Sequence, residues 1–87
     1  MNLSSIGIIG AGQMGSGIAY VCAASGYKVK LYDIDSKLIN IALEKINKNL
    51  SYQLKIKNIN QTEKEAAFSL VEPINNLRKL SSVDLII

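Results

Sequence analysis

The stretch IGIIGAGQMGSGIAYVCAASGYKVKLYDID, residues Ile6 to Asp35, decides the fold of this 87-residue chain. It opens with a short apolar run, Ile6 to Ile9, of the kind that forms a strand covered on both faces in a parallel sheet. The glycine spacing G-x-G-x-x-G follows at once, from Gly10 to Gly15, and leads into a helical segment. The apolar residues that recur there at helical intervals, and so predict the buried face of the helix, are Met14, Ile18, Val21 and Cys22.

A second strand is predicted from Lys28 to Asp33. It comes directly after Gly26, which fits a left-handed cap at the end of the helix. The apolar residues expected to give this strand its hydrophobic weight are Val29, Leu31 and Ile34. Strand, glycine turn, helix and strand together have the length of one βαβ unit, which predicts a parallel sheet.

Each glycine of the motif has a physical role in binding a dinucleotide. Gly10 permits the tight turn, Gly12 lets the backbone approach a pyrophosphate, and Gly15 lets the helix pack close to the sheet. The backbone N–H groups of Gln13 and Met14 would lie at the helix N-terminus, where the helix dipole favours an anion. The residues predicted to hold the pyrophosphate are Gly10, Ala11, Gly12, Gln13, Met14 and Gly15.

Asp33 stands at the end of the second strand, about twenty residues beyond the glycines, where a carboxylate accepts the ribose hydroxyls of an adenosine. Taken alone, it also fits an aspartate that caps a loop. A carboxylate at this position would repel a 2′-phosphate, and no arginine follows nearby, so NAD is expected rather than NADP. NADP remains an alternative, because the flexible side chain of Lys37 could bring its ammonium group to a 2′-phosphate.

Gly17 and Cys22 lie in the predicted helix beyond the glycine motif. Gly17 weakens a helix by about 1 kcal/mol relative to alanine, so a close contact is expected to compensate for it. Cys22 is the only cysteine and sits among apolar residues, which predicts a buried thiol in a reducing compartment. The cytoplasm is therefore the expected location.

The composition excludes several classes of protein. Apolar residues make up 48% and charged residues 20% of the chain, which is typical of a folded globular domain. The net charge of +3 comes mostly from lysine, without interleaved aromatic residues, so no nucleic-acid partner is expected. No signal peptide or membrane-spanning segment is predicted, and hence no membrane partner. Because the sequence contains no histidine, no catalytic residue and no metal site is predicted.

The remainder of the chain is expected to hold further helices and strands. A long amphipathic helix is predicted from Ser36, as N-cap, to about Leu54, and a shorter helix is predicted to start at the capping box Thr62 to Glu65 and end near Ser69. The later elements expected are a strand over Leu70 to Ile74, a helical turn over Leu77 to Ser81, and an apolar strand over Val83 to Ile87. Pro73 indicates either that its strand lies at a sheet edge or that the strand ends at this residue.

Four lysines crowd the second half of the long helix and the loop after it: Lys45, Lys48, Lys55 and Lys57. They fit a solvated, lysine-rich face. They also fit a site for an anionic group of a substrate, and the sequence pattern leaves both interpretations open.

The glycine stretch, the long helix after it and the segment SSVDLII near the end together resemble the N-terminal part of the 3-hydroxyacyl-CoA dehydrogenases, in particular the bacterial 3-hydroxybutyryl-CoA type. The resemblance covers essentially the whole chain. It implies that NAD is the cofactor, with its pyrophosphate at Gly10 to Gly15 and its adenosine ribose at Asp33. It also implies a helical insert, about residues 36–69, that touches the CoA of an acyl-CoA substrate, with a contacting lysine at or near Lys55 or Lys57.

The resemblance implies an α/β fold, namely the first half of a doubly wound (Rossmann) parallel sheet with a helical insert between the second and third strands. Residues 1–87 would form a partial, incomplete NAD-binding domain without the family's catalytic His–Glu pair and without its C-terminal helical domain, through which full-length members form homo-oligomers. The chain alone is expected to be inactive. The complete enzyme would interconvert 3-hydroxyacyl-CoA and 3-oxoacyl-CoA in fatty acid and butanoate metabolism.

Two alternatives remain open from the sequence. The strand that ends at Ile87 is expected to lie beside the first strand, in the middle of the sheet. The chain could be a stand-alone nucleotide-binding or interaction module, in which case this apolar strand would be an exposed edge prone to aggregation. It could also begin another NAD-linked hydroxyacid dehydrogenase, such as the 3-hydroxyisobutyrate or UDP-glucose type. The long insert before the third strand argues against that second alternative.

Overall fold

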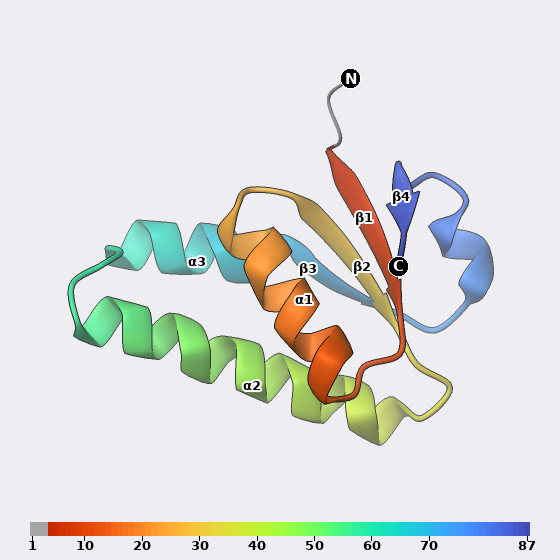
Figure 1. Cartoon of the computed structure of the whole chain (residues 1–87), viewed down its shortest axis with the longest axis horizontal. Coiled ribbons are helices and arrows are strands. Elements are labelled where there is room, and N and C mark those ends of the chain that lie inside the picture. The colour runs from red at the N-terminus through yellow and green to blue at the C-terminus, as the bar shows by residue number, and fades with distance from the viewer. Residues whose placement is uncertain (1–3) are drawn as a thin grey trace.

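A computed structural model describes residues 4–87 as a parallel sheet with helices packed against it (Figure 1). The sheet has four strands in the order β3-β2-β1-β4. All its neighbouring strands pair in parallel, with Ile6 opposite both Val29 and Leu85. The strands are β1 (Ser5–Ile9), β2 (Lys28–Tyr32), β3 (Val71–Ile74) and β4 (Leu85–Ile86).

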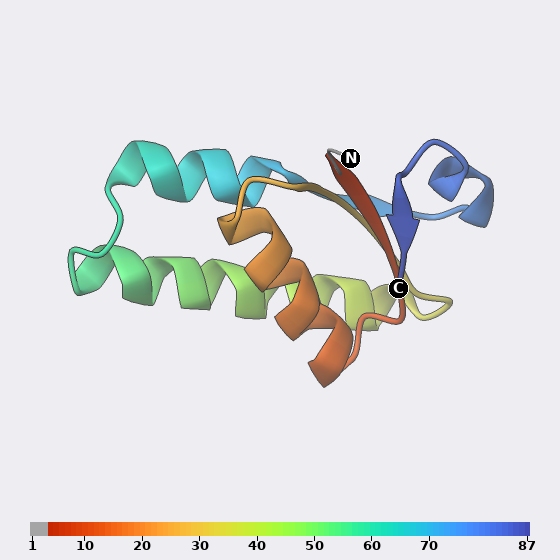
Figure 2. The same ribbon diagram turned by 45° about the horizontal axis from the view of Figure 1, so that its top comes forward.

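Three α-helices and one short 3₁₀-helix connect these strands: α1 (Gln13–Ala24), α2 (Ser36–Lys55), α3 (Gln61–Ser69) and η1 (Leu77–Leu80). Both α2 and α3 lie between β2 and β3 in the chain, where they form an antiparallel pair alongside α1 (Figures 1 and 2). The fold prediction is therefore confirmed: the chain forms a doubly wound type of parallel sheet with a helical insert between its second and third strands.

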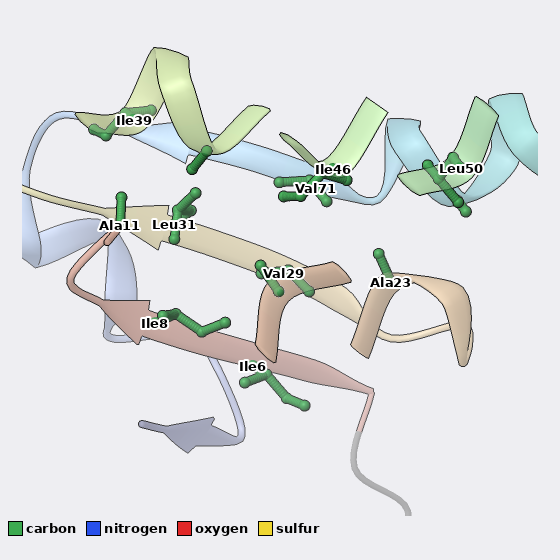
Figure 3. Close-up of a cluster of buried hydrophobic side chains, with 13 residues drawn as sticks. Ile6, Ile8, Ala11, Ala23, Val29, Leu31, Ile39, Ile46, Leu50 and Val71 are labelled. Atoms are coloured by element: carbon green, nitrogen blue, oxygen red, sulfur yellow. The ribbon is translucent and has the colours of Figure 1, made fainter. Parts of the chain in front are cut away.

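The hydrophobic core lies between one face of the sheet and the three α-helices (Figure 3). Ile8, Leu31 and Val29 supply its sheet side, and each is at most 1% exposed. Ile46 and Leu50 of α2 close it from the helix side. Side chains on alternate residues of a strand point to opposite faces, so Lys30 projects from the other face. There its ammonium donates to the Lys79 carbonyl oxygen at 2.9 Å, which ties η1 to the sheet.

All four predicted strands are present, although β4 is confined to Leu85–Ile86 rather than extending from Val83 to Ile87. Pro73 lies on β3, which is an edge strand as predicted, and β4 pairs with β1 as expected. The second strand, however, stops at Tyr32. Ile34 was expected to add apolar weight, but it is 92% exposed, so that prediction was wrong.

The predicted buried face of α1 is wrong for two of its four residues, whereas Ile18 and Cys22 pack, partly buried, against the core as predicted. Met14 and Val21 are 80% and 60% exposed, and the buried residues of this helix are Ser16, Ala19 and Ala23. α1 packs against α2 and against strands β1 and β2. Small side chains therefore occupy the fully buried positions of this helix, whereas Met14 and Val21 point outward. A prediction from hydrophobic periodicity gives most weight to large apolar residues, so it placed the buried face beside the one that the small residues form.

Both predicted helix caps are displaced towards the N-terminus. The N-cap of α2 is Asp35 rather than Ser36, and its side chain accepts a hydrogen bond from the Lys37 N–H. The capping box of α3 is formed by Asn60 and Glu63, rather than by residues 62–65. Asparagine and aspartate cap helices as well as serine and threonine do, and in this chain each stands shortly before the predicted cap.

Two expectations about the remainder of α1 are also corrected. Cys22 is only partly buried, and this burial raises the pKa of its thiol. A Cβ atom placed on Gly17 would meet no atom within 4 Å, so no close contact explains that glycine.

Candidate functional site

The glycine turn between β1 and α1 adopts a conformation that requires two of its glycines. Gly10 has a φ angle of +105°, which favours glycine, and its N–H donates to the Tyr32 carbonyl oxygen at 2.7 Å. A Cβ atom on Gly15 would overlap the Gly10 carbonyl oxygen. The turn thus folds back directly onto the first turn of α1, and the absence of a side chain at Gly15 allows that approach.

The start of α1 presents backbone donors that have no acceptor in the described part of the chain. The helix begins at Gln13, and its N-cap, Gly12, provides no side-chain cap. The first backbone bond of the helix is the one that the Ser16 N–H donates to the Gly12 carbonyl oxygen, at 2.9 Å. The N–H groups of Gly12, Gln13 and Met14 are left to point out of the helix, at the positive end of its dipole. This arrangement suits an anion such as a phosphate.

These donors border a pocket at the carboxyl ends of β1 and β4. The pocket has a volume of about 460 Å³, and Ile9, Ile18 and Ile87 line it together with the glycine turn. A Cβ atom on Gly12 would meet no protein atom within 4 Å, so the space beside this glycine is open. Ligands of doubly wound sheets bind at this edge, outside the carboxyl ends of the strands.

Asp33 lies beside the same turn and is held by two backbone donors. Its Oδ2 accepts a hydrogen bond from the Ala11 N–H, and its Oδ1 accepts one from the Asp35 N–H, both at 2.8 Å. The bond from Ala11, followed by the bond from Asp35, lowers the pKa of this carboxyl below its ordinary value of 3.8. Asp33 is therefore ionised at neutral pH and acts as a loop cap in addition to standing at the predicted ribose position.

The structure separates the four lysines into two pairs. Lys45 and Lys48 line a pocket of about 300 Å³ between α1 and α2, together with Gln13, Ser16, Gly17 and Asn49. Lys55 ends α2, about 15 Å beyond Lys45 at the rise of an α-helix. Lys57 lines a separate surface pocket with Leu54 and the residues that lead into α3. The structure thus brings Lys45 and Lys48, rather than Lys55 and Lys57, next to the first residues of α1.

The pocket between α1 and α2 was not predicted from the sequence. Two signals in the sequence point to it in retrospect. Lys45 and Lys48 are three residues apart, which places them on one side of a helix. Gly17 removes a side chain from α1 where the two helices flank the pocket.

Another pocket, of about 450 Å³, lies at the amino ends of the strands and is lined by serines together with Lys28, Lys30 and Glu72. It is at the wrong edge of the sheet for a dinucleotide. Within residues 4–87 there is no cluster of three or more acidic or cysteine side chains able to hold a metal ion. The same residues include no helix with the length and apolarity needed to cross a membrane.

Comparison with known proteins identifies one family of dehydrogenases that this chain resembles over nearly its whole length. The profile of a family described as "3-hydroxyacyl-CoA dehydrogenase, NAD binding domain" matches residues 5–87. A 3-hydroxybutyryl-CoA dehydrogenase of Bradyrhizobium diazoefficiens is 36% identical over 85 residues, which are 98% of this chain and 29% of that protein. A 3-hydroxyadipyl-CoA dehydrogenase of Escherichia coli is 30% identical over 87 residues, which are 100% of this chain and 18% of that protein.

Solved structures agree with the sequence comparisons. The crystal structure of a 3-hydroxybutyryl-CoA dehydrogenase from Escherichia coli has a TM-score of 0.93 at 29% identity, covering 99% of this chain and 18% of that one. That of a (S)-3-hydroxybutyryl-CoA dehydrogenase from Ralstonia eutropha has a TM-score of 0.92 at 26% identity, covering 98% of this chain and 30% of that one. The chain therefore spans only a minor part of the length of these relatives.

Proposed function

Since the chain belongs to the 3-hydroxyacyl-CoA dehydrogenase family, within its NAD-binding domain, we propose that the glycine turn and Asp33 hold the adenosine half of NAD. The residues assigned to the pyrophosphate are Gly10, Ala11, Gly12, Gln13, Met14 and Gly15. The observation that carries this assignment is the set of unpaired N–H groups at the start of α1, next to an ionised carboxylate at the end of β2.

The start of α1 and Asp33 bind different parts of the cofactor. The N–H groups of Gly12, Gln13 and Met14 donate to pyrophosphate oxygens at the positive end of the α1 dipole. Asp33 keeps its remaining lone pairs for the ribose hydroxyls, and its charge disfavours the 2′-phosphate of NADP. When bound, NAD supplies the hydride acceptor or donor for an oxidoreductase.

We extend the proposal to the longer protein of this family type. Residues 1–87 form the part of an NAD-binding domain that holds adenosine and pyrophosphate. The whole protein interconverts 3-hydroxyacyl-CoA and 3-oxoacyl-CoA in the cytoplasm, in fatty acid and butanoate metabolism, as a homo-oligomer. No catalytic residue is assigned within this chain, so the 87 residues alone are expected to be inactive as a dehydrogenase.

For the acyl-CoA substrate, the phosphates of CoA need ammonium groups within reach of the cofactor site. Lys45 and Lys48 meet this requirement, because they share a pocket with the first residues of α1. Lys55 and Lys57 lie farther along the insert, where they would contact only the outer end of an extended CoA. We assign the inner anion contact to the first pair and retain the second pair for the outer contact.

Titration of the chain with NADH, followed by nucleotide fluorescence, tests the cofactor assignment. The wild-type chain should bind NADH and should bind NADPH much more weakly, and Asp33→Ala should lose that preference. Failure of the folded wild-type chain to bind NADH would contradict the assignment.

A second titration, with CoA, tests the lysines. The double variant Lys45→Ala/Lys48→Ala should bind CoA less well than Lys55→Ala/Lys57→Ala, which removes the same charge. The reverse order would move the inner contact to Lys55 and Lys57.

A further inference from the structure

We propose that Asp33 is also a positioning residue, which clamps the glycine turn so that the donors at the start of α1 are prearranged for a pyrophosphate. This inference deepens the proposed function and rests on it. It assigns Asp33 an effect on a part of the cofactor that its carboxylate does not touch.

The clamp is visible in the hydrogen bonds that join the turn to the end of β2. The Gly10 N–H donates to the Tyr32 carbonyl oxygen at 2.7 Å, and the Ala11 N–H donates to Asp33 Oδ2 at 2.8 Å. Two consecutive residues of the turn are thus bonded to two consecutive residues that lie about twenty positions later in the chain. The first bond uses only backbone atoms, whereas the second depends on the side chain at position 33.

The carboxylate itself is fixed from its other side. Asp33 Oδ1 accepts from the Asp35 N–H at 2.8 Å, and Asp35 in turn caps α2 by accepting from the Lys37 N–H at 2.9 Å. The plane of the Asp33 carboxylate is therefore held by backbone donors on two sides. It connects the turn that precedes α1 to the turn that precedes α2.

The Ala11 N–H has no easy alternative to this acceptor. Ala11 is 3% exposed and belongs to the hydrophobic core (Figure 3), so the residue cannot rotate towards water without losing its packing. The adjoining Gly10 carbonyl oxygen rests against the position where Gly15 would carry a Cβ atom. A shift of Ala11 would therefore move the first turn of α1, from which Gly12, Gln13 and Met14 present their N–H groups.

Charge and clamp make opposite predictions about anion binding. Asp33 is negative, so its charge alone repels a pyrophosphate, and removing it should strengthen the binding of that anion. Removal of the clamp should weaken the same binding, because the donors lose their fixed arrangement. Inorganic pyrophosphate contains no ribose, so it reports the clamp without any contribution from a bond between Asp33 and the ribose.

The experiment compares wild type, Asp33→Asn and Asp35→Asn by NMR, using inorganic pyrophosphate as the probe. Asparagine at position 33 has the same shape but a single acceptor oxygen, so it cannot accept from both Ala11 and Asp35. Asp35→Asn removes the same charge nearby, and asparagine remains a good N-cap for α2. We expect Asp33→Asn to weaken pyrophosphate binding about threefold to tenfold, and Asp35→Asn to leave it unchanged or tighter.

Hydrogen exchange of backbone amides provides a readout that needs no ligand. The Ala11 amide should exchange slowly in wild type and about tenfold faster in Asp33→Asn, while Asp35→Asn leaves it unchanged. The Gly12 amide, which has no acceptor among the described residues, should exchange quickly in all three proteins.

Each outcome decides between the proposals. Equal pyrophosphate binding in the two variants, with unchanged Ala11 exchange, would overturn the clamp and leave Asp33 as a ribose ligand only. A folded wild-type chain that binds neither pyrophosphate nor NADH would overturn the proposed function. The clamp would then still be tested by the exchange rate of the Ala11 amide, compared between wild type and Asp33→Asn. If Asp33→Asn does not fold, equally fast exchange of Ala11 and Gly12 in wild type would overturn the clamp.

Discussion

At the scale of single residues, positions 12, 15 and 17 are each occupied by glycine, but for different physical reasons. Gly15 is required by the protein itself, because a side chain there would overlap the Gly10 carbonyl oxygen. A Cβ atom at Gly12 or Gly17 would meet no protein atom within 4 Å, so the protein alone does not require a glycine at either position. Gly12 borders the proposed pyrophosphate site, and Gly17 borders the pocket between α1 and α2.

The first prediction concerns stability. Gly15→Ala should lower the free energy of unfolding by about 1–3 kcal/mol, because the new Cβ atom would overlap the Gly10 backbone carbonyl oxygen, which cannot rotate away. Gly17→Ala should instead raise it by up to about 1 kcal/mol, because alanine favours an exposed helix position over glycine. Urea unfolding followed by circular dichroism measures both. Equal effects of the two substitutions would contradict the assigned roles.

The second prediction concerns the cofactor. Gly12→Ala should leave the unfolding free energy within about 1 kcal/mol of wild type, because its Cβ meets no protein atom. It should weaken NADH binding at least about tenfold, because the methyl group occupies space that the pyrophosphate needs. Fluorescence titration with NADH measures the loss. Undiminished NADH affinity in Gly12→Ala would show that the pyrophosphate does not approach this residue.

At the scale of helices, the third prediction concerns the start of α3. Asn60→Ala should destabilise the chain by about 0.5–2 kcal/mol, because it removes the acceptor for the Glu63 N–H, at 2.8 Å. Thr62→Ala is the matched control and should change the stability by less than about 0.5 kcal/mol, since Thr62 lies inside the helix. Thermal unfolding of both variants checks the order. A larger effect at Thr62 would favour the capping box that the sequence pattern predicts.

The sequence predicted the elements better than their contacts. The βαβ unit, the long α2, the edge strand β3 and the pairing of β4 with β1 all follow from local patterns and from the chirality and order of parallel strands. The glycine spacing also located the turn and the free donors of α1. These features depend on residues close together in the chain, which is why a single sequence suffices for them.

Contacts between distant residues were harder to predict. The buried face of α1 consists of Ser16, Ala19 and Ala23 because α2 lies so close, and that proximity is a property of the tertiary fold. The grouping of Lys45 and Lys48 with α1 depends on the angle at which the two helices cross. The hydrogen bond between the Ala11 N–H and Asp33 joins residues 22 positions apart, and no local sequence pattern predicts it.

At the scale of the whole molecule, the carboxylate of Asp84 links two segments of the described chain that lie 80 residues apart in sequence. Asp84 Oδ2 accepts from the backbone N–H groups of Ser4 and Ser5, at 2.9 and 3.0 Å, and from both of their hydroxyl groups. This links the loop before β4 to the start of β1. The backbone bonds, that of Ser4 first, lower the pKa of the Asp84 carboxyl below 3.8.

The fourth prediction follows from that pKa. A carboxyl with a lowered pKa in the folded state stabilises the fold above its unfolded value, and this contribution is lost as the pH falls below 3.8 through the folded value. The free energy of unfolding of wild type should therefore fall as the pH drops below 3.8, and Asp84→Asn should reduce that fall. Urea unfolding at a series of pH values measures how the free energy of unfolding changes with pH in each protein. Parallel curves for the two proteins would show that Asp84 does not contribute.

The fifth prediction concerns the edge of the sheet that β4 forms. β4 pairs only with β1 in the described chain, and Leu85, Ile86 and Ile87 are 43%, 53% and 49% exposed. An exposed apolar edge strand offers unpaired backbone groups to another chain, so the 87-residue chain by itself should associate as its concentration rises. Ile86→Lys should reduce this association, because a lysine on an edge strand opposes pairing. Ile34→Lys, at a 92% exposed position outside the sheet, adds the same charge and should have no such effect. Sedimentation or light scattering over a range of concentrations compares the three proteins, and equal suppression by both lysines would assign the association to net charge rather than to the edge of β4.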